Sequence, residues 1–120
     1  MPTAKYQNHQ GSGPTLLEDV LRLQGDFRRA LLPMGVTPLQ AGVLCYLHRH
    51  EGAQLGNVAV SLSVQPPTLV AVVKDLTRKR WLTSRRSAED RRAVCLRLSR
   101  KGETLVRKVM QRIARCKRNA

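Results

Sequence analysis

The chain has 120 residues, which is enough for one domain with a single core and too few for two domains of ordinary size. Apolar residues make up 42% of it and aromatic residues only 3%, so the core must consist mainly of Leu, Val and Ala. This composition favours helices over a β-sandwich. The net charge of +14 excludes an acidic or neutral surface and indicates a polyanionic partner.

The positive charge is concentrated in the second half of the chain. Residues 1–70 contain five Lys or Arg and four Asp or Glu, whereas residues 71–120 contain seventeen and four. Nucleic acid is therefore the favoured partner, and basic residues that only confer solubility are the alternative. Three cysteines without paired spacing argue against a secreted disulfide framework. With no long apolar run or signal-type segment, we expect a cytoplasmic protein with no membrane partner.

The N-terminal part predicts an arm followed by a helix. Residues 1–13 are polar and aperiodic, which predicts a disordered arm ahead of one domain at residues 14–118. Thr15 and Glu18 fit a capping box and predict a helix from there to about Leu32. Its apolar residues recur at intervals of three and four: Leu16, Val20, Leu23, Phe27 and Leu31. Together with the last helix, this helix is expected to serve dimerisation.

Three more helices are expected before residue 80. A capping box at Thr37-Pro38-Leu39-Gln40 predicts a second helix to about His50, and Leu55–Leu62 forms a short third one. After a tight turn at Ser63-Val64-Gln65, Pro66-Pro67 can open a fourth helix. Its buried stripe would be Leu69, Val72, Val73 and Leu76, which leaves an outward face of Gln65, Thr68, Ala71, Lys74, Asp75 and Arg78.

The last third predicts a hairpin and a final helix. Leu82–Arg86 and residues 93–98 can pair as strands around a loop with several charged residues, the wing. Ser99 fits the N-cap of the final helix. That helix has an apolar stripe of Leu105, Val109, Met110 and Ile113, and basic residues cover its other side.

The expected fold is mainly α with a small β-hairpin, in the order α-α-α-α-β-β-α, a winged helix-turn-helix. This arrangement can enter both grooves of duplex DNA. Candidate DNA contacts are Gln65, Thr68, Ala71, Lys74 and Arg78 on the fourth helix and Arg86, Arg91 and Arg92 at the wing. Asp90 would orient the wing by a bidentate pair with an arginine. The alternative for the fourth helix is an ordinary polar surface helix. The alternative for Asp90 and the wing arginines is an exposed ion pair that contributes little energy.

Other chemistry has weaker support. Cys45 and His48 share a helix face, but a structural zinc site needs four ligands and the others are not evident. A redox switch at Cys95 or Cys116, each near an arginine, is a minor alternative. No paired carboxylates, Gly-rich phosphate loop or Ser/His/Asp set is recognisable, so we expect neither an enzyme nor a cofactor.

Several motifs occur in this sequence at spacings that match those of a known protein family. The most specific is Asp90-x-Arg92 followed by Leu98-Ser99-x-x-Gly102. The other matching residues are Thr37-Pro38, Leu44, Leu47, Leu55, Val58-Ala59, Leu62, Val64, Pro66-Pro67-Thr68, Leu76 and Leu96. Over about Thr37 to Leu105, the sequence thereby resembles the MarR family of bacterial transcriptional regulators.

The resemblance implies a homodimeric regulator of double-stranded DNA, typically a repressor on a pseudo-palindromic operator. The fourth helix of each subunit would enter a major groove and each wing the flanking minor groove. Family members often respond to small phenolic ligands or to oxidants; no ligand-binding residue is identified here. Two alternatives stay open: a nucleic-acid binder without sequence preference, and a protein-interaction module that kept the fold.

This sequence departs from the family in several places. The family usually has Gly where Arg80 stands, which predicts a different helix end here, and Arg where Ser84 stands. Polar base contacts are common where Val70 and Ala71 stand, so apolar contacts with thymine methyls or DNA shape must contribute more. The sequence also ends near the close of the fifth helix, whereas the family generally adds one more helix to the dimer interface.

Overall fold

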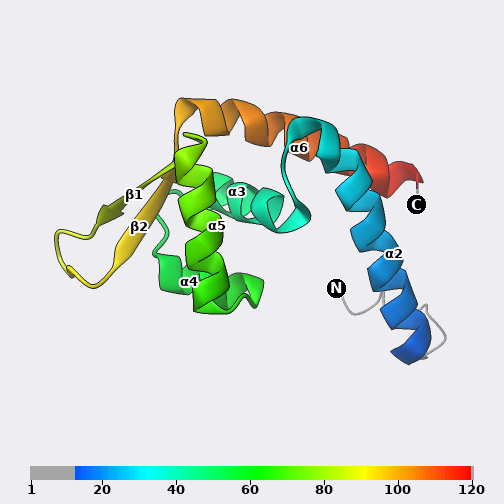
Figure 1. Cartoon of the computed structure of the whole chain (residues 1–120), viewed down its shortest axis with the longest axis horizontal. Coiled ribbons are helices and arrows are strands. Elements are labelled where there is room, and N and C mark those ends of the chain that lie inside the picture. The colour runs from blue at the N-terminus through cyan, green and yellow to red at the C-terminus, as the bar shows by residue number, and fades with distance from the viewer. Residues whose placement is uncertain (1–12, 120) are drawn as a thin grey trace.

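The computed structural model describes residues 13–119, with side chains through Cys116, as helices around one small hairpin (Figure 1). The predicted disordered arm lies outside the described residues except for Gly13. The elements are α2 (Gly13–Leu31), the short 3-10 helix η1 (Leu32–Met34), α3 (Pro38–Arg49), α4 (Leu55–Leu62), α5 (Pro66–Arg78), β1 (Leu82–Arg86), β2 (Val94–Leu98) and α6 (Arg100–Asn119). This order confirms the predicted winged helix-turn-helix.

Proline and capping residues set the start of α3 as predicted. The Thr37 hydroxyl accepts the Gln40 backbone N–H at 3.1 Å, and the Gln40 side-chain oxygen accepts the Thr37 N–H at 3.0 Å. The capping box predicted at Thr15 is wrong, because α2 already begins at Gly13 and Thr15 lies within its first turn. Pro14 fits that first turn, where a missing N–H costs no hydrogen bond.

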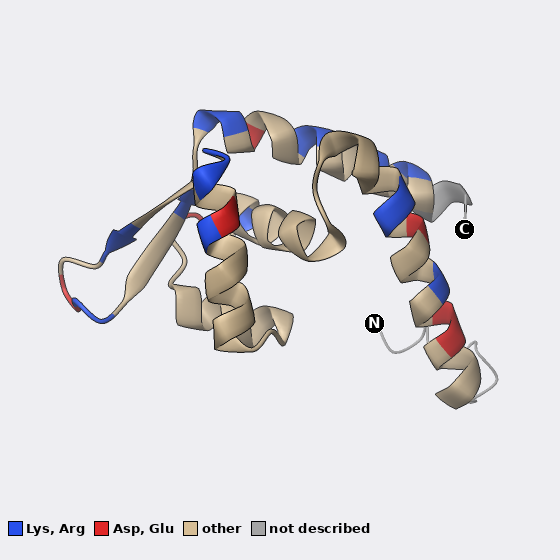
Figure 2. Ribbon diagram, in the orientation of Figure 1, with Lys and Arg blue, Asp and Glu red and all other residues tan. Residues whose placement is uncertain are grey.

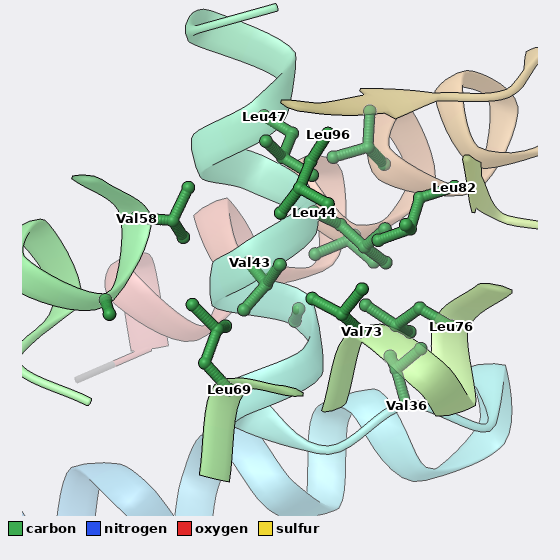
Figure 3. Close-up of a cluster of buried hydrophobic side chains, with 14 of the residues drawn as sticks. Val36, Val43, Leu44, Leu47, Val58, Leu69, Val73, Leu76, Leu82 and Leu96 are labelled. Carbon is green, nitrogen blue, oxygen red and sulfur yellow. The ribbon is translucent and has the colours of Figure 1, made fainter. Parts of the chain in front are cut away.

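One apolar core joins α3, α4, α5, the hairpin and α6 (Figure 3). Leu44, Leu69 and Leu96 come from three different elements and are all 0% exposed. The final helix contributes Val106 and Val109, whereas Met110, predicted to lie in its buried stripe, is 38% exposed. An apolar residue that fits the spacing of a helical stripe is therefore not always buried in the core of its own chain.

The first helix leaves most of its apolar side chains uncovered. Only Leu31, at its C-terminal end, is fully buried, whereas Leu17, Val20 and Leu21 are 59%, 41% and 57% exposed. Figure 1 shows the N-terminal part of α2 projecting away from the rest of the molecule, whereas its C-terminal part lies against α6. No single helix among residues 13–119 is both long and apolar enough to cross a membrane.

The hairpin is anchored at its base by the chain on both sides. β1 and β2 pair antiparallel, with Leu82 opposite Leu98 and Arg86 opposite Val94. The other edge of β2 pairs with the segment before α4, since Gly52 N–H donates to Leu96 and Leu96 N–H to Ala53. The wing thus projects from a rigid base.

The start of α6 explains the Leu-Ser-x-x-Gly motif. The Ser99 hydroxyl accepts the Gly102 N–H at 3.0 Å, which confirms Ser99 as the N-cap, and donates to the Arg80 carbonyl at 2.6 Å. A Cβ on Gly102 would lie 1.9 Å from the Trp81 carbonyl oxygen. Only glycine therefore lets α6 pack this closely against the chain entering β1.

Candidate nucleic-acid interface

The helix-turn-helix consists of α4, a tight turn and α5. The turn is closed by two backbone hydrogen bonds, Ser63 N–H to the Val60 carbonyl and Val64 N–H to the Ala59 carbonyl. Ser63 has a φ of 53°, in the left-handed region where glycine is usual. The paired hydrogen bonds form a Schellman motif, which ends α4 and turns the chain into α5.

The part of the helix-turn-helix that protrudes carries no charge. From residue 52 to residue 73 there is no Asp, Glu, Lys or Arg; we call residues 52–73 the recognition segment. Figure 2 shows α4 and the N-terminal part of α5 without charged residues. Val60 and Val70 are 80% and 36% exposed, and a shallow hollow beside the turn is lined mainly by apolar residues, including Val60, Val64 and Pro66. This surface is suited to apolar and shape contacts rather than to phosphate binding.

The predicted base-contacting residues all lie on the surface of α5 or at its start. Gln65, Thr68 and Ala71 are exposed, and the Gln65 side chain is not used as a cap. Pro66 and Pro67 have no backbone N–H and the Leu69 N–H donates to the Gln65 carbonyl, so the first turn of α5 offers few free donors and contacts there depend on side chains. The three positions are therefore available to a ligand at the N-terminal end of α5.

The predicted phosphate-contacting residues of α5 lie in a different environment. Lys74 is exposed, whereas Arg78 forms an ion pair with Asp75 at 3.0 Å. Asp75 was expected to face outward, but it is partly buried and accepts a 2.6 Å hydrogen bond from the Gln40 side chain of α3. Lys79 adds a second ion pair with Asp75 at 3.6 Å. Asp75 therefore holds α5 against α3 and orients the guanidinium of Arg78.

Sequence reasoning missed this role of Asp75 and Gln40. The spacing of Asp75 three and four residues before Arg78 and Lys79 is a detectable sign of helical ion pairs. The partner on α3 lies 35 residues away in the chain, and no local pattern predicts such a contact.

The end of α5 keeps the left-handed conformation despite the absence of glycine. Arg80 has a φ of 64°, its N–H donates to Thr77, and the Trp81 N–H donates to Leu76. This is again a Schellman motif, so the expectation of a different helix end at Arg80 is wrong. An arginine in this conformation costs conformational energy that a glycine would avoid.

The wing, residues 87–93, is held by short-range hydrogen bonds. The Ser87 hydroxyl accepts the N–H groups of Glu89 and Asp90, and the Arg86 guanidinium donates to the Arg91 carbonyl at 2.8 Å. The predicted bidentate pair of Asp90 with an arginine is not among the ion pairs of the described residues. Instead, the Asp90 carboxylate accepts the Arg92 backbone N–H at 3.0 Å. Asp90 thus orients the backbone of the wing, and Arg91 and Arg92 stay exposed at its tip.

The outer face of the hairpin is also basic. Arg85, Arg86 and Arg97 line an open hollow there together with Cys95, and Arg97 pairs with Glu51 at 2.6 Å. The hollow has a volume of about 510 Å³. Arg85 and Arg86 therefore extend the positive charge of the wing along the sheet, whereas the charge of Arg97 nearer the base is paired with Glu51.

The candidate metal residues Cys45 and His48 lie in surroundings that do not suit a metal site. His48 contacts the Glu103 carboxylate of α6 at 3.0 Å through Nδ1. Burial raises the pKa of the Cys45 thiol, and the nearby Arg49 guanidinium opposes that shift, so this cysteine is not set up as a thiolate. Among residues 13–119, no three His, Cys, Asp or Glu side chains gather in a way that fits a metal ion.

Comparison with known proteins gives consistent matches. The MarR family model matches residues 34–93, half of the chain. The chain is 25% identical over 89 residues to the HTH-type transcriptional repressor MdtR of Bacillus subtilis (strain 168), a match covering 74% of this chain and 57% of that protein. It is 27% identical over 85 residues to YhbI of the same organism, an HTH-type transcriptional regulator, over 71% and 55% of the two chains. The chain thus spans little more than half the length of these relatives.

Solved structures share the fold. The transcriptional repressor CouR, bound to a 23-mer DNA duplex, superposes with a TM-score of 0.81 at 29% identity, over 85% of this chain and 72% of that one. The S. aureus MepR–DNA complex superposes with a TM-score of 0.83 at 21% identity, over 90% and 81%. At the lower identity the match concerns the fold alone.

Proposed function

Because the chain belongs to the MarR family of transcriptional regulators, which are not enzymes, we propose that it regulates transcription by binding double-stranded DNA. One observation carries this proposal: a protruding, exposed N-terminal end of α5 and an exposed basic wing are held by the same core. The first element suits a major groove and the second a minor groove. CouR, the structural relative at 29% identity, is itself a repressor bound to a DNA duplex.

The contacts divide by chemistry. Gln65, Thr68 and Ala71 face base edges, with Val70 and Ala71 against thymine methyl groups. Lys74 and Arg78 contact phosphates further along α5, and they position the protein without selecting sequence. At the wing, Arg91 and Arg92 enter a narrow minor groove, and Arg86 and Asp90 shape the loop that presents them.

The active form in this proposal is a homodimer. The exposed Leu17, Val20 and Leu21 of α2 form an apolar face that a second copy would cover, and Met110 of α6 is exposed as well. Two-fold symmetry then presents two recognition helices to a pseudo-palindromic operator. In this proposal the dimer is a cytoplasmic repressor that a small phenolic ligand releases from DNA.

A titration of two duplexes at two salt concentrations tests the proposal. The full chain is titrated by fluorescence anisotropy against DNA from upstream of its own coding sequence and against a scrambled duplex of equal length. A sequence-specific regulator binds the upstream duplex on the order of a thousandfold more tightly or better.

The alternatives give different titrations. Equal affinities with a steep salt dependence would identify a binder without sequence preference, a second candidate that the apolar Val70 and Ala71 on α5 and the basic residues of α6 favour. Negligible binding to both duplexes at moderate salt would identify a protein-interaction module on the same fold.

A further inference from the structure

The outer side of α6 carries a continuous row of basic side chains. At 3.6 residues per turn, these residues fall on the side of the helix opposite Val106 and Val109, which are 0% exposed in the core. All are exposed except Arg112, which is partly exposed. We call them the α6 stripe: Arg100, Lys101, Arg107, Lys108, Arg112 and Arg115.

The charges of the α6 stripe are not neutralised within the described part of the chain. None of its six side chains takes part in any of the ion pairs found among residues 13–116. The acidic residue of α6, Glu103, faces inward and contacts His48 of α3. Six unpaired cations on one helix face repel one another and are stabilised by a polyanion that covers them.

The α6 stripe and the recognition segment lie at opposite edges of the molecule. Figure 1 shows α6 along the upper edge and α4 with the N-terminal end of α5 along the lower edge, and Figure 2 shows basic residues along α6. The molecule measures 29 Å in the direction that separates these edges. A straight duplex engaged by the recognition segment therefore does not reach the α6 stripe, and a duplex wrapped around both edges would have to bend sharply.

The chemistry of the stripe selects among polyanions. None of its six residues is aromatic, and the one aromatic side chain beside it, Trp81 in a hollow with Lys101 and Lys108, is too few for the successive stacking of single-stranded bases. Apart from Met110, the apolar side of α6 is occupied by the core, so the helix has no continuous free apolar face to insert into a membrane. The stripe also lacks the aromatic anchors of protein interfaces.

Among the possible polyanions, the phosphate backbone of a DNA duplex fits the α6 stripe best. From Arg100 to Arg115 the helix rises about 22 Å, and along that length of duplex axis each strand carries one phosphate about every 3.4 Å. Four of the six side chains are arginines, whose planar guanidinium groups can contact phosphate oxygens in a bidentate manner.

We propose that the α6 stripe binds the backbone of a second DNA duplex without sequence preference, so that the protein can bridge two duplexes. Bridging goes beyond the proposed function and depends on it only for the first duplex. The second contact adds no base recognition, because nothing on the stripe is shaped to enter a groove.

A bead capture assay with the full chain tests bridging. A biotin-tagged fragment of the upstream DNA is immobilised, the protein is added, and an unrelated fluorescent duplex is offered in solution. Retained fluorescence is divided by retained protein, so that binding of the first and second duplexes is measured separately. Two charge-matched variants are compared, Arg107→Gln/Lys108→Gln in the stripe and Arg91→Gln/Arg92→Gln in the wing.

We expect the stripe variant to be retained on the beads like the unmodified protein while capturing on the order of tenfold less fluorescent duplex per molecule. The wing variant should be retained less but keep its capture per retained molecule. Circular dichroism checks that the variants fold, and Lys101→Gln/Arg115→Gln replaces the stripe variant if it does not.

Three results would overturn bridging. The first is no capture by unmodified protein that is itself retained. The second is undiminished capture by the stripe variant, since the second duplex would then be held by the other half of a dimer. The third is competition by single-stranded DNA as strong as by duplex. Failure of the proposed function gives a different result. Beads that carry upstream DNA and beads that carry a scrambled duplex would then retain equal amounts of protein.

Discussion

The recognition segment and the wing offer DNA opposite kinds of surface. The recognition segment has no charged residue over 22 positions, and its shape is fixed by buried side chains such as Val58 and Leu69, both 0% exposed. The wing is exposed, rich in arginine, and fixed by short-range hydrogen bonds to Ser87 and Asp90. Under the proposed function, affinity and sequence preference would therefore be carried by different regions, because phosphate contacts supply the first and base contacts the second.

The largest expected effect is a loss of stability at Gly102, where α6 packs against the chain that enters β1. Gly102→Ala should lower the free energy of unfolding by about 3 kcal/mol, because the added Cβ would overlap the Trp81 carbonyl oxygen. Urea denaturation measures this loss. The matched control is Gly42→Ala in α3, where a Cβ meets nothing within 4 Å, and it should be neutral or stabilising by up to about 1 kcal/mol. Equal stability of both variants would contradict the close packing at α6.

Removing charge from the wing should weaken DNA binding without affecting the fold. Arg91→Gln/Arg92→Gln is expected to reduce affinity on the order of tenfold at physiological salt, since two phosphate or minor-groove contacts are lost. Any change in sequence preference should be confined to the A·T positions flanking the operator. The charge-matched control is Arg28→Gln/Arg49→Gln. Both residues lie outside the proposed DNA interface. A control variant that weakens binding as much would show that net charge alone matters.

Relaxing the end of α5 should stabilise the protein. Arg80→Gly removes the cost of a left-handed arginine and is expected to raise the free energy of unfolding by about 1 kcal/mol, or the Tm by about 4 °C. Thermal unfolding followed by circular dichroism detects this gain. A lower Tm would mean that the Arg80 side chain contributes contacts that outweigh its backbone strain.

Trimming an apolar contact in the recognition segment should have the smallest effect. Val70→Ala is expected to reduce affinity for the operator about fourfold for each recognition helix, the equivalent of about 0.8 kcal/mol, because one of the two methyl groups removed is expected to contact a base. Binding to a scrambled duplex should not change. If both duplexes lose affinity equally, Val70 does not face a base.

Local chemistry in the sequence was enough to predict the order of the elements and most of their bounds. The cap at Thr37 and the prolines at 66 and 67 mark helix starts, and the alternation around Leu96 gives the strand. The exposed Val20 and Met110 could not be foreseen, because apolar spacing reveals a face but not what covers it.

At the candidate site, the surface positions of α5 and the exposed arginines of the wing followed from periodicity and composition. The partners of Asp75 and Asp90 did not. Asp75 bonds to a residue far away in the chain, and Asp90 accepts a backbone N–H where a nearby guanidinium was an equally reasonable partner. Charge pattern identifies which residues can interact, and only the packed structure decides among them.

The salt dependence of DNA affinity tests the division between the two regions most directly. Affinity of the unmodified protein, Val70→Ala and Arg91→Gln/Arg92→Gln for the upstream duplex is measured across a salt series. We predict that the slope of log affinity against log salt becomes shallower by about 3.6 for the wing variant, which lacks four arginines per dimer, and stays unchanged for Val70→Ala. An unchanged slope for the wing variant, or an equally shallow slope for Val70→Ala, would contradict the division.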